Sequence, residues 1–516
     1  MNRVRVAAMT ASFNYLQYAL AIASGLVLVP LTINAVGPRS YGLWLATGEL
    51  LGYAGMIDPG VLGVLPWMVA EADGGRDRQR LRELVSNGVA VGSVVGLGYA
   101  LVASVLWVLV PATVNVPVAD RSALAQPLLL LVAATALAYP LRTFSALLAG
   151  LQDALFNGVL NVAQSATYFA IALVGLSRGW GLYALALASV SSTLVAAAAS
   201  LVRALVIAPD LLKRWPRPQP ATIRSLLANG VGVWIAGFGW RLIAASTSMV
   251  IALVGRTEWV AIYSCTSKLS ALSTQLAWVL PDSGLIGLSQ LHGEGRPQSR
   301  VRTVVMMIIR LHLVLAGTTA CAVLVFNPAF VTAWVGPAYF GGHALNLWLA
   351  GGIVASSLVH ALVTTASVLG KRIAVGAVTV ANGVAQTALA FLFGASWSLG
   401  GIAAAAVVAA LATSAPAGLV LLRASTGMTL RMFWLELLAP WLQRMVPVAG
   451  ACVAVGILIR DAGPIAAAGV TAIALGICFL AVRPLLFGLP LDERWMQRLV
   501  RARVLPPRAA IAVEPS

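Results

Sequence analysis

Apolar runs of about 20 residues recur from one end of this 516-residue chain to the other. An α-helix of that length crosses a hydrocarbon core of ~30 Å and satisfies its backbone polar groups internally. Membrane β-strands would instead give alternating segments of ~10 residues, and the sequence contains no such pattern. Hydrophobic residues make up 60% of the chain and charged residues only 10%, too few for the surface of a soluble protein of this length. The sequence therefore predicts an all-α polytopic membrane protein.

These runs predict about fourteen transmembrane helices. The first run, Ser12–Ile33, is longer than the core of a signal peptide and has no clear cleavage site after it, so we expect it to be the first span. The thirteenth run is the shortest. The predicted spans are Ser12–Ile33, Gly42–Val69, Leu84–Val110, Leu128–Ala149, Gly158–Leu176, Leu182–Ile207, Leu226–Val254, Trp259–Leu288, Val304–Phe326, Ala344–Leu369, Ala374–Ala395, Ser398–Leu422, Met445–Ile459 and Pro464–Val482.

Lys and Arg are concentrated in alternate loops between the predicted spans. The formal net charge is +17, but the basic residues lie in short loops, which argues against a nucleic-acid partner. Positively charged loops stay on the cytoplasmic side and contact anionic lipids, so we expect both termini to be cytoplasmic. The basic loops contain Arg76, Arg78, Arg80 and Arg82; Lys213, Arg214, Arg217 and Arg224; Arg296, Arg300 and Arg302; Lys371 and Arg372; and Arg423 and Arg431, whereas the opposite loops contain only Arg39, Arg121, Arg178, Arg256 and Arg460.

A proline-rich connection over residues 208–224 divides the chain into two similar halves. In each half a span, a short outer loop and a second span lead to a cytoplasmic turn, Glu71–Arg76 in the first and His292–Pro297 in the second. Six spans per half give both halves the same orientation, as in parallel repeats around a central cavity. The predicted parts are a six-helix lobe over 1–207, a cytoplasmic linker over 208–224, a second six-helix lobe over 225–422, two additional helices over 423–482 and a basic cytoplasmic tail over 483–516.

The segment Asn14–Asp77 contains family motifs. It has a proline in the first span, an outer turn from Val36 to Trp44, and an Asp58-Pro59-Gly60 element in the second span. It reads NYLQYALAIASGLVLVPLTINAVGPRSYGLWLATGELLGYAGMIDPGVLGVLPWMVAEADGGRD. The segment resembles the polysaccharide-biosynthesis (O-antigen type) oligosaccharide flippase family, part of the multidrug/oligosaccharidyl-lipid/polysaccharide exporter superfamily. The motifs cover about one-eighth of the chain, and the twelve-plus-two organisation resembles the superfamily over its whole length.

The resemblance implies a flippase that moves a polyprenyl-pyrophosphate-linked oligosaccharide across the bacterial cytoplasmic (inner) membrane for surface polysaccharide biosynthesis. The sugar head would cross by alternating access through a hydrated, cationic cavity between the two lobes. No ATP hydrolysis and no cofactor are implied, and the sequence has no phosphate-binding GxxxxGK[ST] loop. Coupling to protons or sodium, and the choice between O-antigen, capsule and exopolysaccharide, stay open. The expected partners are the lipid-linked oligosaccharide, anionic membrane lipids and other polysaccharide-assembly proteins.

Four ionisable residues lie deep within predicted spans: Glu49 and Asp58 in the second, Arg241 in the seventh and Lys268 in the eighth. Charges at such depth are costly and normally face a cavity or a partner. The second and eighth spans are equivalent in the repeat, where Glu49 aligns with Lys268. We expect these two residues to face each other across the cavity, with Arg241 and Lys268 binding the pyrophosphate. The alternative is a buried ion pair that only packs the lobes together.

Asp58 and Pro59 form a candidate coupling or gating element in the second span. Asp58 follows Glu49 by nine residues, about 180° round an ideal helix, so the two carboxylates share a face only if Pro59 kinks the helix. Asp58 is therefore either a protonatable coupling site or a cap for backbone donors that are freed near Pro59.

The remaining polar residues have simpler interpretations. The arginines of the first basic loop, Arg76, Arg78, Arg80 and Arg82, are expected to contact membrane-surface lipid, or alternatively to capture the anionic lipid carrier. Asp282 is expected to be a helix-end residue. The four histidines show no ligand spacing, and the four cysteines lie inside apolar runs, so no metal site is expected and the thiols are interpreted as structural.

Two other classes of function remain as alternatives. An ion-coupled exporter of small drugs from the same superfamily would have an acidic or aromatic site without the cationic pair. A polysaccharide polymerase or membrane glycosyltransferase would need acid, base or metal-binding residues gathered outside the lipid. The connections between predicted spans are short, the longest having 22 residues between Leu422 and Met445, so we expect that the protein is not an enzyme.

Overall fold

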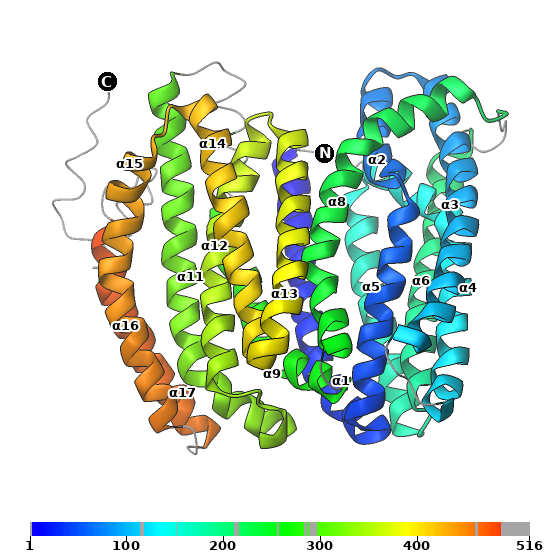
Figure 1. Cartoon of the computed structure of the whole chain (residues 1–516). Coiled ribbons are helices and arrows are strands. Elements are labelled where there is room, and N and C mark those ends of the chain that lie inside the picture. The colour runs from blue at the N-terminus through cyan, green and yellow to red at the C-terminus, as the bar shows by residue number, and fades with distance from the viewer. Residues whose placement is uncertain are drawn as a thin grey trace. The chain divides into compact units, whose positions relative to one another are not determined.

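The computed structural model describes residues 3–113, 118–151, 153–210, 216–254, 257–282, 285, 288, 297–459 and 463–486. All regular secondary structure in these ranges is helical, which confirms the predicted all-α class. Packing divides the chain into two compact units, unit 1 over Met1–Ala261 and unit 2 over Ile262–Ser516, and each is described by itself (Figure 1).

Within the described ranges, eleven helices are long and apolar enough to cross a membrane. Two of them contain a break: α1 (Arg3–Ala54) at Gly37, where φ is 78°, and α13 (Arg372–Ala409) at Trp397 and Ser398. These breaks separate the first predicted span from the second and the eleventh from the twelfth. The eighth predicted span corresponds to α9 (Thr257–Asp282), a helix that is less apolar than the eleven. The polytopic membrane fold is thereby confirmed.

Unit 1 is a bundle in which α4 (Val118–Gly150) packs between α3 (Arg78–Thr113) and α6 (Leu182–Ile207). In the same unit α5 (Ala154–Ser177) packs between α1 and α6, and α8 (Pro220–Val254) lies against α1 and α2 (Val61–Gly74).

Small residues permit close packing in this bundle. A Cβ atom at Gly92 of α3 would lie 2.9 Å from the Pro140 Cα of α4, and one at Gly96 would lie 2.5 Å from the Ala136 carbonyl oxygen. Backbones that approach this closely are typical of membrane helices, whose association depends on packing contacts.

The second predicted span, Gly42–Val69, is not one continuous helix. After α1 the chain forms a short 3₁₀ turn, η1 (Gly55–Ile57), and α2 begins only at Val61. Pro59 lacks a backbone N–H, and Gly60 adopts a left-handed conformation with φ of 81° that other residues rarely adopt. The break is held by α8, since the Trp234 indole nitrogen donates a hydrogen bond to the Met56 carbonyl oxygen at 2.7 Å.

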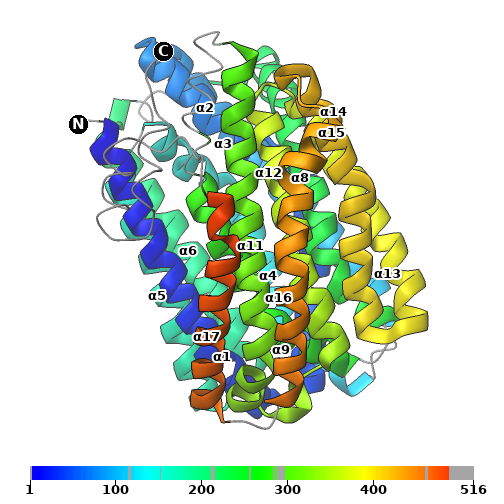
Figure 2. The same ribbon diagram turned by 90° about the vertical axis from the view of Figure 1, so that its left-hand side faces the viewer.

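Unit 2 is organised around α11 (Gln298–Val335), whose side chains form much of the hydrophobic core. It packs against α12 (His343–Val368), α16 (Ala439–Leu458) and α17 (Pro464–Val482), and Figure 2 shows α16 and α17 running beside it. The Trp441 indole nitrogen of α16 donates to the Leu313 carbonyl oxygen of α11 at 2.8 Å. The unit also contains most of α9, η2 (Pro337–Tyr339), α13, the π-helical η3 (Ala410–Ser414), α14 (Ala415–Thr426) and η5 (Arg483–Leu486).

The predicted start of the thirteenth span, Met445–Ile459, lies well after the residue at which the helix begins in the structure. A continuous helical segment starts at Leu430, through α15 (Leu430–Met432) and the π-helical η4 (Phe433–Leu438), and runs into α16. Glu436 and Arg444 interrupt the apolar pattern of this segment, which explains the late start that was predicted.

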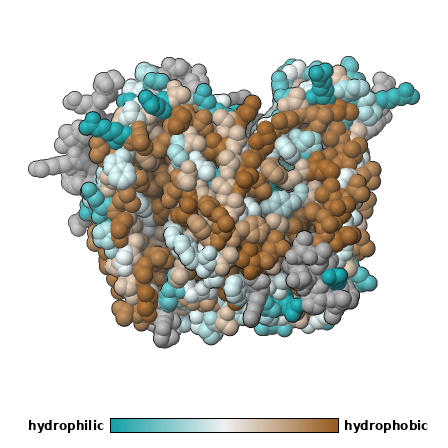
Figure 3. Space-filling view, in the orientation of Figure 1, coloured by the Kyte–Doolittle hydropathy of each residue, from teal (hydrophilic) through white to brown (hydrophobic). Residues whose placement is uncertain are grey.

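Hydrophobic side chains cover the middle of the visible face of each unit, and hydrophilic ones gather toward the upper and lower ends (Figure 3). That distribution is the one expected of helices that cross a hydrocarbon layer. The predicted lobe and linker boundaries stay predictions, because the two units group helices by packing and not by the internal repeat. The predicted tail, 483–516, lies outside the described residues beyond Leu486.

Candidate functional site

Glu49 and Arg241 form an ion pair within unit 1. The Arg241 Nη2 atom of α8 lies 3.4 Å from Glu49 Oε2 of α1, and the same nitrogen donates to the Glu49 carbonyl oxygen at 3.2 Å. The Arg241 side chain is 29% exposed and the Glu49 side chain is 32% exposed, so neither is fully buried. The structure thus joins two of the predicted site residues, which lie 192 positions apart in the sequence.

The guanidinium group of Arg241 occupies a space that a glycine leaves open. A Cβ atom at Gly52, one turn beyond Glu49 on α1, would overlap the guanidinium nitrogens. On another side the guanidinium carbon lies 6.0 Å from the centre of the Tyr53 ring, within the range of a cation–π contact. The absence of a side chain at Gly52 therefore helps to position the charge of Arg241.

Lys268 lies on α9, in unit 2, and is half-buried. Among the residues that the structure describes, no carboxylate forms an ion pair with it. The helix around it is fixed by Thr266, whose hydroxyl donates to the Tyr339 carbonyl oxygen at 3.0 Å and accepts from the Gly341 amide at 2.9 Å. The predicted approach of Glu49 to Lys268 would join the two units and stays a prediction.

Asp58 caps the start of α2. Its Oδ1 atom accepts a hydrogen bond from the Val61 amide at 3.0 Å, which satisfies one of the free backbone donors at this helix end. Asp58 and Pro59 both lie in the break between η1 and α2, so Asp58 is not on the helix that carries Glu49. A role of Asp58 and Pro59 in coupling or gating stays a prediction.

Two of the four arginines of the first basic loop contact the chain near the start of α8: Arg82 contacts the connection between α6 and α8, and Arg80 contacts the first turn of α8. Arg80 donates to the Thr222 hydroxyl at 3.1 Å, and Arg82 donates to the Asp210 carbonyl oxygen at 3.2 Å. Arg76 and Arg78 are exposed beside them. The predicted contact of these arginines with lipid headgroups stays a prediction, and the structure adds a role in fastening this connection to α3.

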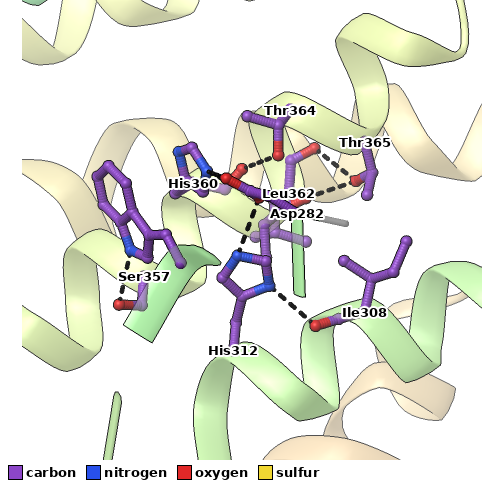
Figure 4. Close-up of polar contacts among 10 residues, drawn as sticks. Asp282, Ile308, His312, Ser357, His360, Leu362, Thr364 and Thr365 are labelled. Atoms are coloured by element: carbon purple, nitrogen blue, oxygen red, sulfur yellow. Dashed lines mark hydrogen bonds and ion pairs between the residues drawn. The ribbon is translucent and has the colours of Figure 1, made fainter. Parts of the chain in front are cut away.

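A cluster that the sequence analysis missed joins α9, α11 and α12 in unit 2 (Figure 4). His360 Nε2 lies 3.0 Å and 3.1 Å from the two carboxylate oxygens of Asp282, and His312 Nε2 lies 3.5 Å from Oδ1 of the same carboxylate. Asp282 is therefore more than the helix-end residue that was expected. The three residues come from three helices, so no local spacing in the sequence could have indicated their approach.

The thiols of Cys321, Cys452 and Cys478 also meet in unit 2, within 4.8 Å of one another. They come from α11, α16 and α17, and all three are buried without a disulfide. Cys265 is buried and free on α9. All four cysteines are buried and free, as expected of structural thiols. The approach of Cys321, Cys452 and Cys478 to one another was not predicted.

Arg241 and Lys268, the two cations of the predicted site, differ in their chemistry. Arg241 offers a planar donor that suits phosphate oxygens, and Lys268 offers a compact charge. The carboxylate of Glu49 balances the charge of Arg241. Binding of a pyrophosphate by Arg241 and Lys268 stays a prediction.

No family model matches the chain, and no curated protein matches it. Solved structures do resemble it. An inward-facing multidrug resistance MATE family transporter of the MOP superfamily has a TM-score of 0.68 at 16% identity, over 80% of this chain and 96% of that one. The same kind of transporter in an outward-facing conformation has a TM-score of 0.58 at 15% identity, over 82% of this chain and 96% of that one.

The lipid II flippase MurJ, in an inward closed conformation, has a TM-score of 0.64 at 10% identity, over 87% of this chain and 96% of that one. Identities this low establish the fold alone. The fold expected for the exporter superfamily is therefore confirmed. Membership of the polysaccharide-biosynthesis family stays a prediction.

Proposed function

We propose that this protein is a flippase that moves a polyprenyl-pyrophosphate-linked oligosaccharide across the bacterial cytoplasmic membrane by alternating access. The observation that carries the proposal is Lys268, a cation inside a membrane helix with no carboxylate partner among the described residues. An unbalanced charge at that depth is costly and calls for an anionic ligand. The fold supports the proposal, since one solved structure that shares it is a lipid II flippase.

The proposed binding step uses both cations. Arg241 leaves Glu49 to form paired hydrogen bonds with a phosphate group, and Lys268 supplies the second positive charge. After the head group has left, Glu49 takes back Arg241, so that the site does not retain the anion. Both termini lie in the cytoplasm, and coupling to a proton or sodium gradient resets the empty protein. No cofactor takes part.

The test is the leaflet distribution of lipid-linked oligosaccharide in cells depleted of this protein and then supplied with variants. Wild type and the control Lys371→Ala, which changes an exposed loop lysine, should clear the cytoplasmic leaflet. Lys268→Ala should leave the substrate there, with transport lowered at least about 10-fold, since one charged hydrogen bond contributes about 1.5–3 kcal/mol. Lys268→Arg should restore part of the transport.

Other outcomes identify the alternatives. An unchanged leaflet distribution after depletion would refute the flippase proposal and favour an ion-coupled drug exporter; the MATE structures that share the fold are multidrug resistance transporters. Export of cationic dyes from the same cells would then distinguish wild type from depleted cells. Accumulation on the outer leaflet would point to a polymerase or glycosyltransferase step instead.

A further inference from the structure

The cluster of Asp282, His312 and His360 carries an inference that goes beyond the proposed function. The tautomer of His312 is set by its surroundings, because its Nδ1 atom lies 2.9 Å from the Ile308 carbonyl oxygen. A carbonyl only accepts, so Nδ1 carries the hydrogen, and in the neutral ring Nε2 has a lone pair. That lone pair points at the Asp282 carboxylate, and Nε2 is buried without a hydrogen-bond partner in the described part of the chain.

A lone pair that faces a carboxylate is unfavourable unless a positive species lies between them. A histidine with its Nδ1–H held by a backbone carbonyl and its Nε2 free has the arrangement found in metal-binding histidines. The second histidine is positioned differently. The His360 ring stacks on Trp278 with 3.9 Å between ring centres and 2° between planes, and the Trp278 indole nitrogen is held by the Ser357 hydroxyl at 2.9 Å.

The spacing of the three groups fits one metal ion. Ligands at the usual zinc distances of about 2.0–2.2 Å and at tetrahedral angles lie about 3.3 Å from one another. From Asp282 Oδ1, the oxygen that both rings approach, the separations are 3.1 Å to His360 Nε2 and 3.5 Å to His312 Nε2, on either side of that value. All three ligand atoms lie within 4.8 Å of one another, so a small closure of the side chains would bring them onto a common ion.

The chemistry of the ligands selects the class of ion. Two imidazole nitrogens and one carboxylate suit Zn²⁺ and neighbouring first-row divalent ions, whereas Na⁺, Mg²⁺ and Ca²⁺ prefer oxygen ligands. Three protein ligands leave a fourth position for water or an anion. His312 is fully buried, whereas Asp282 is 34% exposed and gives an ion a way in.

We propose that Asp282, His312 and His360 bind one divalent transition-metal ion of the Zn²⁺ class through a carboxylate oxygen and two Nε2 atoms. Because the ligands come from α9, α11 and α12, the bound ion would fasten the end of α9 to the other two helices of unit 2. A proton shared within the cluster would explain the same contacts without a metal, so the two possibilities must be separated by direct binding.

The experiment uses the purified full-length protein without an affinity tag, stripped with a chelator and titrated with Co²⁺, whose absorption reports its ligands. Wild type should bind one Co²⁺ per chain with visible bands of a tetrahedral site and no sulfur charge-transfer band. His312→Gln and His360→Gln should weaken binding at least about 100-fold, because even the outer partners of metal ligands contribute about 10–100-fold. The control His343→Gln, at the start of α12, should bind like wild type.

Two further variants guard against misfolding and against binding by thiols. His360→Cys keeps a zinc ligand, so it should retain Co²⁺ and gain a sulfur charge-transfer band, which a misfolded protein would not show. Cys452→Ala should bind like wild type. Absence of stoichiometric Co²⁺ and Zn²⁺ binding in wild type, equal binding by His312→Gln, or a sulfur band in wild type that Cys452→Ala removes would each overturn the proposal.

Discussion

At the scale of single residues, the position of one charge depends on the absence of a side chain. Arg241 reaches Glu49 by passing over Gly52, and its guanidinium group fills the volume that any Cβ atom there would occupy. Gly48, one turn earlier on the same helix, has open space at the corresponding point. The two glycines therefore look alike in the sequence but differ in what a methyl group would displace.

Gly52→Ala should impair transport without preventing folding. The displaced atoms are the far end of a flexible side chain, so Arg241 can move away, and alanine favours the helix by about 1 kcal/mol. Loss of the contact with Glu49 should lower flipping of lipid-linked oligosaccharide several-fold, whereas Gly48→Ala should transport like wild type. The leaflet assay, run beside thermal unfolding of the purified variants, checks both statements. Equal transport by the two variants would mean that the ion pair has no part in the process.

Contacts between individual side chains were the feature that the sequence predicted least well. Glu49, Arg241 and Lys268 could be singled out because charges are conspicuous in apolar runs. The contact of Glu49 with Arg241 could not be predicted, because it joins helices that are far apart in the chain. The same holds for Asp282, whose histidine partners are 30 and 78 positions away in sequence.

At the scale of helices, the apolar runs predicted nearly every membrane helix. The predicted helix bounds were wrong where polar residues interrupt a helix. Glu436 and Arg444 lie inside the segment that starts at Leu430, so a search for apolar runs found only its second half. Asp58, Pro59 and Gly60 had the opposite effect, because their apolar neighbours concealed a break that the structure places between η1 and α2.

This break gives a prediction for α8. A Cβ atom at Gly230 would lie 2.6 Å from the Pro59 carbonyl oxygen, a backbone atom that cannot turn aside, whereas one at Gly232 would meet open space. Gly230→Ala should therefore lower the free energy of unfolding by about 1–3 kcal/mol through overpacking, and Gly232→Ala should leave it unchanged or raise it slightly. Thermal unfolding in detergent measures the difference. Equal melting temperatures would show that the backbone at Pro59 can move away from α8 at little cost in free energy.

At the scale of the whole molecule, the distribution of basic residues predicts which loops face the cytoplasm. Arg178 follows α5 and Arg78 begins α3, on loops of opposite predicted side, and both side chains are exposed. In intact cells a membrane-impermeant maleimide should label Arg178→Cys, and it should label Arg78→Cys only after lysis. The four native thiols are buried and should contribute little background. The reverse labelling pattern would invert the orientation.

The polar contacts of α9 affect how the chain enters the membrane during synthesis. By composition α9 is not among the helices apolar enough to cross a membrane, and a lysine near a helix centre, such as Lys268, costs about 2.5–3.5 kcal/mol at the translocon. Its polar contacts are made with Asn327, His312 and His360, which are synthesised later. We expect nascent chains that end after α9 to leave it accessible to glycosylation or protease in a translation system, and chains that extend past α12 to protect it. The ribosome would thus have to complete two more helices before this one can be released into lipid.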